Sequence, residues 1–305
     1  MPIDGSGWVL AGQVIDSVTA APVAGAVVTV RGNPPVTTDP GGRWRVEGKG
    51  AADSRLWTTV MAPGFVPRET ALNWRAEGRQ DAFIELLPER APFVLGFYRY
   101  LVRNGFEEPG SLEAVRRWTT NPNFYIRTYN PKTGRPLESA EVEAIVSTIR
   151  QAVPQLTGAA LAAGSIETGA ADRAPRQNYI NVAIVHEPSE EFCGQAFVGA
   201  NPGEIDINYD RCASSCRGTA SKIPPAAVAH EVGHALGFWH VDRGLMSAYL
   251  SGDCGNVQFS EAERLHAGLA YRRPAGNTDP DRDPADFAAA LTSSATKISC
   301  PTGRP

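Results

Sequence analysis

One eleven-residue segment constrains this chain more than any other part of its sequence. It holds His230, Glu231, His234, Gly237 and His240 at fixed spacing. On a helix of 3.6 residues per turn, His230 and His234 lie one turn apart on the same face, so both imidazoles can reach one ion. Glu231 then lies beside that ion without binding it and can hold a water molecule. The spacing predicts a helical metal site with its own base.

Gly237 explains how a third histidine can join the first two. Glycine adopts positive φ without steric cost, so the chain can end the helix and turn back to bring His240 to the ion. Three histidines leave the fourth position of a zinc ion open, as in catalytic sites. Average residue usage gives five such fixed positions by chance about once in 10⁵ chains of this length. We therefore expect one catalytic Zn²⁺.

The chemistry that follows is hydrolysis. Zinc lowers the pKa of a bound water and polarises a scissile carbonyl. Glu231 is expected to take the water's proton as general base and to deliver it to the leaving amine. The two remaining histidines, His186 and His266, are expected to be a strand-end residue and a helix-surface residue.

The segment His230–His240 resembles the zinc signature of the metzincin metallopeptidases. The resemblance implies that Met246 packs in a turn beneath the metal without binding it. It also implies an exposed sheet edge that binds substrate as an added strand. We expect that edge in the strand 195–200, whose candidate binding residues are Gln195, Ala196, Phe197, Val198 and Gly199.

Two positions depart from the metzincin subfamilies. Val241 follows His240 and does not match the residue typical of the best-known groups. Tyr249 lies three positions after Met246, whereas astacin- and serralysin-like groups place a zinc-side tyrosine two positions after. Tyr249 is a candidate oxyanion helper, with a packing role as the alternative. The subfamily and the substrate are not indicated.

Residues 1–88 are predicted to form a small all-β sandwich. Short apolar or alternating runs are separated by Pro- and Gly-rich turns. The expected strands are Trp8–Val14, Ala26–Val30, Arg43–Val46, Trp57–Met61 and Phe83–Leu87. The segments Gly12–Asp16, Pro22–Val30 and Thr37–Trp44 resemble the carboxypeptidase regulatory-like fold, which implies an accessory domain.

A proline-containing linker ends at Pro92, and residues 92–272 then mix helical and strand patterns. Helices are expected at 93–104, at 139–153 with Ser139 as N-cap and Pro154 as the end, after Pro224, and from Ser260 with a capping box to Glu263. Strands are expected at 124–128 and 180–185, with a hairpin of 195–200 and 204–209. This predicts a multidomain chain whose second part is an α+β domain with a mixed sheet, an active-site helix and a small C-terminal subdomain, which the resemblance identifies as metzincin-like.

Residues 273–305 are polar and are predicted to form a flexible tail. Asp279, Asp281, Asp283 and Asp286 resemble a calcium loop, but the glycine and terminal glutamate of an EF-hand are missing. A solvated acidic linker is favoured over a Ca²⁺ site.

Four of the five cysteines, Cys193, Cys212, Cys216 and Cys254, surround the histidine motif, whereas Cys300 stands alone. Two disulfides in any of three pairings are favoured, which suggests a secreted protein. The alternative takes Cys212 and Cys216 as half of a thiolate zinc site. No signal peptide is visible in the first seven residues.

The net charge of −4 and the pI of about 5.8 give no reason to expect binding to nucleic acid or anionic membranes. No apolar run is long enough for a transmembrane segment. We expect a secreted zinc endopeptidase acting on protein or peptide substrates. The alternative is a binding or adhesion protein whose sandwich carries the role, with peptidase activity secondary; the intact Glu231 favours the enzyme.

Overall fold

The computed structural model describes residues 7–49, 55–73, 80–211, 216–217, 221–250, 252–285 and 296–301. The chain is a β-rich protein of two compact units. Unit 1 combines Met1–Leu95 with Gly276–Ala289, and unit 2 combines Gly96–Ala275 with Ala290–Pro305. The predicted linker at residues 88–92 therefore lies close to the first boundary between the units.

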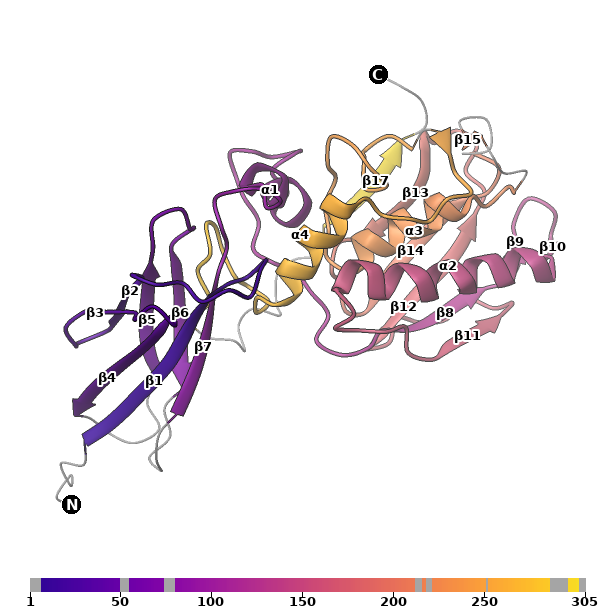
Figure 1. Ribbon diagram of the computed structural model, residues 1–305. Coiled ribbons are helices and arrows are strands. Elements are labelled where there is room, and N and C mark those ends of the chain that lie inside the picture. Colours follow the sequence, from indigo (N-terminus) through magenta and orange to yellow (C-terminus); the bar gives the residue numbers. More distant parts are fainter. Residues whose placement is uncertain are drawn as a thin grey trace, which may run out of the picture. The chain divides into compact units, whose positions relative to one another are not determined.

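Unit 1 contains two sheets, with the strand orders β4-β1-β7 and β3-β2-β5-β6 (Figure 1). The strands are β1 (Gly7–Asp16), β2 (Val27–Val30), β3 (Val36–Thr37), β4 (Arg43–Lys49), β5 (Arg55–Met61), β6 (Arg68–Asn73) and β7 (Gln80–Leu86). Alternating side chains from both sheets meet in one core, which includes Leu10, Trp44, Val28 and Val60. This confirms the all-β prediction, although β3 and β6 were missed.

The flexible tail predicted for residues 273–305 is wrong where the structure describes that stretch. Asp281 and Asp283 are buried, and the Arg68 guanidinium pairs with them at 2.7 and 2.9 Å. The Asn277 amide donates to both carboxylates, at 3.0 and 2.8 Å. A buried carboxylate needs such a partner, and here Arg68 supplies it from far away in the sequence. Because Arg68 pairs with Asp281 and Asp283, these carboxylates do not form the calcium loop that the sequence suggested as an alternative. Asp286 lies outside the described residues.

Arg68→Ala is expected to destabilise unit 1 by about 3–5 kcal/mol, because two buried carboxylates would each lose an ion pair. The check is hydrogen exchange of the β5 and β6 amides, which reports local stability in a chain of two units. Arg45→Ala is the control, since its partner Glu47 and Arg45 itself are 67% and 57% exposed. That exposed pair is expected to change stability by less than about 1 kcal/mol. Equal effects of both substitutions would contradict an anchoring role for Arg68.

Unit 2 is built around a six-stranded sheet in the order β11-β8-β12-β14-β13-β17. Its strands are β8 (Asn123–Arg127), β11 (Ile166–Gly169), β12 (Tyr179–Val185), β13 (Phe192–Phe197), β14 (Gly203–Asn208) and β17 (Lys297–Pro301). Two-stranded ribbons pair β9 (Tyr129–Asn130) with β10 (Arg135–Pro136), and β15 (Cys216–Arg217) with β16 (Gly252–Asp253). β8, β11, β12 and β14 run parallel, whereas β13 is antiparallel to both of its neighbours. The predicted mixed sheet and hairpin are confirmed.

The helices are α1 (Leu95–Arg103), α2 (Ser139–Thr157), α3 (Pro225–Ala235) and α4 (Glu261–Tyr271). In β12, Ile180, Val182 and Ile184 are buried, and the residues between them are half-buried. Helix α3 packs on β13 and β14 and also contacts α2 (Figure 1). None of the helices in the described part of the chain is long and apolar enough to cross a bilayer.

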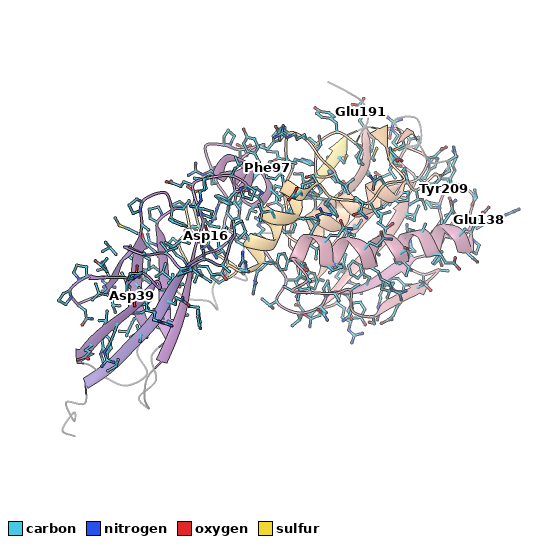
Figure 2. The ribbon with its side chains drawn as sticks, in the orientation of Figure 1. Asp16, Asp39, Phe97, Glu138, Glu191 and Tyr209 are labelled. Atoms are coloured by element: carbon cyan, nitrogen blue, oxygen red, sulfur yellow. A yellow bond between two sulfur atoms is a disulfide. The ribbon has the colours of Figure 1, made fainter. Side chains whose placement is uncertain are left out.

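Two boundaries of α2 differ from the prediction. Its N-cap is Glu138 rather than Ser139, because Glu138 and Glu141 form a reciprocal capping box (Figure 2 shows Glu138 at this end). Pro154 lies inside the helix, which ends at Thr157 and is capped by Gly158 in the left-handed conformation. Helix α4 starts as predicted, with Ser260 and Glu263 forming its capping box.

Candidate metal centre

The three histidines of the motif come together in the interior of unit 2. His230 and His234 lie on α3, and His240 follows the end of the helix. Their Nε2 atoms are 2.8 Å apart for His230–His234 and 3.2 Å apart for both pairs that include His240. All three side chains are buried. Among the described residues, they form the one cluster of ligand-type side chains that could hold a metal ion.

Each imidazole is oriented by a hydrogen bond at its other nitrogen. His230 Nδ1 donates to the Leu245 carbonyl and His234 Nδ1 to the Phe238 carbonyl, both at 2.7 Å. A carbonyl only accepts, so the proton of each neutral ring is on Nδ1 and the Nε2 lone pair points into the cluster. This is the tautomer that binds a metal.

The geometry and the protonation of the cluster both fit a divalent cation. A tetrahedral zinc ion with nitrogen ligands at about 2.0–2.1 Å holds them about 3.3–3.4 Å apart, close to the observed spacing. Burial, together with the neighbouring His240, lowers the pKa of His230 to about 3. Burial and both neighbouring imidazoles hold the pKa of His234 well below its usual value. Neutral imidazoles are the form that metals require.

Gly237 provides the predicted change of direction. Its φ is 110°, a conformation that side-chain-bearing residues rarely adopt. A Cβ at this position would lie 2.1 Å from the Arg116 carbonyl oxygen. The helix therefore ends at Ala235, and the chain turns within five residues to place His240 beside the first two histidines.

Glu231 lies beside the cluster with its carboxyl group buried. Neither carboxyl oxygen has a hydrogen-bond partner among the described residues, and the side chain is fully buried. Burial, and secondarily the Asp206 carboxylate, raise the pKa of Glu231 well above its usual value. An unpartnered buried carboxyl group is costly, so its presence here indicates a functional role. A Cβ on Gly194 would lie 2.6 Å from Glu231 Oε1, so β13 passes directly over this group.

Met246 packs against α3 at Gly233, close to the histidines. It is fully buried, and a Cβ on Gly233 would lie 2.3 Å from its sulfur. Its backbone is held by Val241 N–H, which donates to the Met246 carbonyl at 2.9 Å. Met246 N–H in turn donates to Glu263 Oε1 at 2.6 Å. Glu263, the glutamate of the α4 capping box, thus also holds the turn that contains Met246.

Glu107 contacts the cluster through its side chain, and sequence reasoning missed it. Its Oε1 accepts a hydrogen bond from His240 Nδ1 at 2.6 Å, so it orients the third imidazole as the two carbonyls orient the others. It lies 133 positions before His240, and nothing in its local sequence distinguishes it from its neighbour Glu108. Only the tertiary fold brings the two side chains together.

Glu107→Gln is expected to weaken zinc binding about 10- to 100-fold, because the carboxylate fixes the orientation and raises the basicity of His240. Competition with a chromophoric chelator measures the affinity. Glu108→Gln is the matched control, since Glu108 is exposed. An unchanged affinity in the Glu107 variant would show that His240 is held in place without it.

The prediction that the strand 195–200 is an exposed edge of the sheet is wrong. Strand β13, which contains Gln195, Ala196 and Phe197, is paired on one side with β14 and on the other with β17. The strand that covers it comes from the end of the chain, which its polar composition marked as a tail. Tyr249 is 37% exposed, and no hydrogen bond or ring contact links it to the described residues. Its role as an oxyanion helper therefore stays a prediction.

The remaining cysteine and histidine predictions have mixed outcomes. Cys216 and Cys254 form a disulfide, so the alternative of a thiolate zinc site is wrong. Cys193 is also disulfide-bonded, Cys300 is a buried free thiol, and Cys212 lies outside the described residues. His266 is buried rather than on a helix surface. Its ring packs 4.9 Å from that of Phe97, the residue labelled in Figure 2.

Comparisons with known proteins add no family. No family model matches the sequence, and no curated protein matches it. A cohesin–X-dockerin complex from Acetivibrio cellulolyticus matches 26% of this chain and 57% of its own, with 20% identity and a TM-score of 0.21. A DUF3823 family protein from Parabacteroides merdae matches 28% of this chain and 48% of its own, with 16% identity and a TM-score of 0.22. A 9R-lipoxygenase from Cyanothece matches 51% of this chain and 24% of its own, with 17% identity and a TM-score of 0.18. This chain thus covers about half or less of each of these structures.

Proposed function

We propose that this chain is a zinc-dependent endopeptidase of the metzincin type, which hydrolyses peptide bonds of extracellular proteins or peptides. One observation carries the proposal. Three inward-facing Nε2 atoms lie within 3.2 Å of one another, and the next residue after the first histidine is a buried glutamate whose carboxyl group has no hydrogen-bond partner in the described part of the chain. A ligand triad alone would suit many metal proteins, whereas the added carboxyl group suits a hydrolase.

The residues divide the chemistry among themselves. When bound, zinc supplies Lewis-acid chemistry that polarises a carbonyl and makes water more acidic. His230, His234 and His240 would hold that ion through nitrogens already fixed in the correct tautomer. Glu231 takes the proton of the attacking water and passes it to the leaving amine. The positive charge of the ion favours the ionised form of Glu231, which burial alone disfavours.

The metzincin assignment is supported by features outside the motif. A helix follows the first strand of the sheet, the active-site helix follows the last of the parallel strands, and Met246 packs against Gly233 beneath it. These are the elements that the resemblance implies. The disulfide between Cys216 and Cys254 supports an extracellular site of action, because disulfides persist in oxidising compartments.

Chelation is the first test of the proposal. The protein is expected to cleave an unstructured protein such as casein, to lose this activity completely on removal of the metal, and to regain it with one equivalent of Zn²⁺. Gel electrophoresis of timed samples measures the cleavage. Activity that survives exhaustive chelation, with the metal content confirmed to be zero, would rule out a zinc mechanism.

A further inference from the structure

The strand β17 contacts two segments that also contact the metal centre. One is β13, where Gly194 lies directly against Glu231. The other is the segment 245–250, where the Leu245 carbonyl orients His230. Cys300 of β17 contacts both segments: it is the register partner of Gly194, and its thiol contacts the Ala248 carbonyl at 3.6 Å.

β17 is held on β13 by contacts of the kind that an extended peptide makes. It pairs antiparallel with β13, in the register Gln195–Ser299, Ala196–Ile298 and Phe197–Lys297. Backbone pairing of this kind binds a peptide chain whatever its sequence, whereas pockets for its side chains give a preference for particular residues. Cys300 fills such a pocket: it is fully buried in a cluster with Cys193, Ala226, Ala227, Leu250 and Cys254.

Apart from Cys300, the side-chain contacts that the structure describes for β17 lie near the surface, and one of them places Lys297 Nζ 5.4 Å from the centre of the Phe197 ring. Lys297 pairs with Asp206 at 3.1 Å, with the two side chains 37% and 24% exposed. A pair as exposed as this contributes little stability. The strand is five residues long and forms the edge of the sheet. Short edge strands bound on one side are among the elements of a fold that open most readily.

We propose that β17 occupies the edge of β13 on which the peptide substrate binds, and that the site acts only in those molecules in which β17 has left β13. This inference rests on the proposed peptidase function. The backbone of β17 pairs with the β13 groups that an incoming peptide would otherwise pair with. As a tethered segment it competes at an effective concentration of the order of millimolar, so it slows the cleavage of a weakly bound substrate without abolishing it. The substrate class that follows is an extended, unstructured peptide segment lying antiparallel to β13.

The register supplies a matched pair of variants. Val198 N–H donates to the Thr296 carbonyl, so in an antiparallel ladder the next hydrogen-bonded pair is Ala196 with Ile298. Ile298→Pro removes a donor from this ladder, whereas the Ser299 N–H points away from β13. Ser299→Pro is therefore the control, with the same residue introduced one position away.

The experiment measures binding of a probe peptide by fluorescence anisotropy. The probe is a fluorescein-labelled copy of residues 296–301 with serine in place of Cys300. The proteins are full-length, zinc-loaded chains that also carry Glu231→Gln, so that the probe is not cleaved. We expect the Ile298→Pro chain to bind the probe at least about tenfold more tightly than the parent and the Ser299→Pro chain. Equal binding by all three chains would overturn the proposal.

A second variant covers the case in which Ile298→Pro does not fold, as judged by circular dichroism and zinc content. Lys297→Glu replaces an attraction to Asp206 with a repulsion and leaves every ladder donor in place. It is expected to tighten probe binding in the same direction by a smaller factor, and unchanged binding would count against the proposal.

Cleavage of casein, measured with the same substitutions but with Glu231 intact, separates this inference from the proposed function. Tighter probe binding without any cleavage would reject the peptidase function but would still support the conclusion that β17 blocks a peptide-binding edge on β13. Cleavage by every chain, with equal probe binding and equal rates, would reject the role of β17 and leave the peptidase standing.

Discussion

Glu231→Gln is expected to lower kcat for cleavage of an unstructured protein by about 10²- to 10⁴-fold, the range for loss of a general base. Glutamine has nearly the same shape but cannot accept the water's proton. Gly194 packs directly against the carboxyl group, so the similar size of glutamine also keeps this packing. Because Glu231 is not one of the three ligand residues, the variant is expected to keep one zinc ion and its stability.

The measurement for Glu231→Gln combines initial rates, zinc content by atomic emission and a thermal unfolding curve. Glu191→Gln serves as the control, since Glu191 is an exposed carboxyl group just before β13 (Figure 2). A Glu231 variant with full zinc content and an unchanged kcat would show that another group activates the water. Lost zinc together with lost activity would mean that the residue supports the metal site instead.

His234→Ala is expected to weaken zinc binding by at least about 100-fold, more than the loss of an orienting partner, because a direct ligand is removed. Zinc that binds only the folded chain contributes about 4 kcal/mol of stability at a free concentration 1,000 times its Kd. The variant is expected to lose most of this zinc-dependent stabilisation. His234 Nε2 lies 2.8 Å from that of His230 and 3.2 Å from that of His240, so it forms one corner of the ligand triangle.

The measurement for His234→Ala compares each chain with and without zinc, so that packing lost through the substitution cancels. His186→Ala is the control, because His186 lies outside the metal cluster. If the His234 variant bound zinc as tightly as the parent chain and unfolded at the same zinc-dependent temperature, His234 would not be a ligand.

The parts of this site that could be predicted are local in the sequence. His230 and His234 follow from helical spacing, and Gly237 from its freedom to adopt positive φ, which the structure confirms with a φ of 110°. The capping box of Ser260 and Glu263 is similarly a four-residue pattern. Each of these depends on backbone geometry within one or two turns of chain.

The parts that could not be predicted depend on contacts between distant residues. Glu107 meets His240 across 133 positions, and Arg68 meets Asp281 across 213. A carboxylate in a polar stretch looks the same in sequence whether it is solvated or paired in a core. His266 illustrates the same limit, since its helical position did not reveal that Phe97 covers its ring.

The prediction of a flexible tail at residues 273–305 was the largest error, and it has a physical reason. Its polar composition predicts a solvated tail, yet Gly276–Ala289 belongs to unit 1 and β17 joins the sheet of unit 2. A five-residue strand needs little apolar sequence when backbone pairing supplies most of its contacts. The Gln195–Ala200 strand was therefore expected to be a free edge, although it is covered.

Identification of the bonds that the protein cuts tests the central claim most directly. A library of unstructured peptides is incubated with the zinc-loaded chain, and the new peptide ends are identified by mass spectrometry, with the Glu231→Gln chain in parallel. The account predicts new ends at internal peptide bonds that appear only with zinc and with Glu231 intact. One zinc ion bound per chain and no new ends in either sample, even for the Ile298→Pro chain, would contradict it.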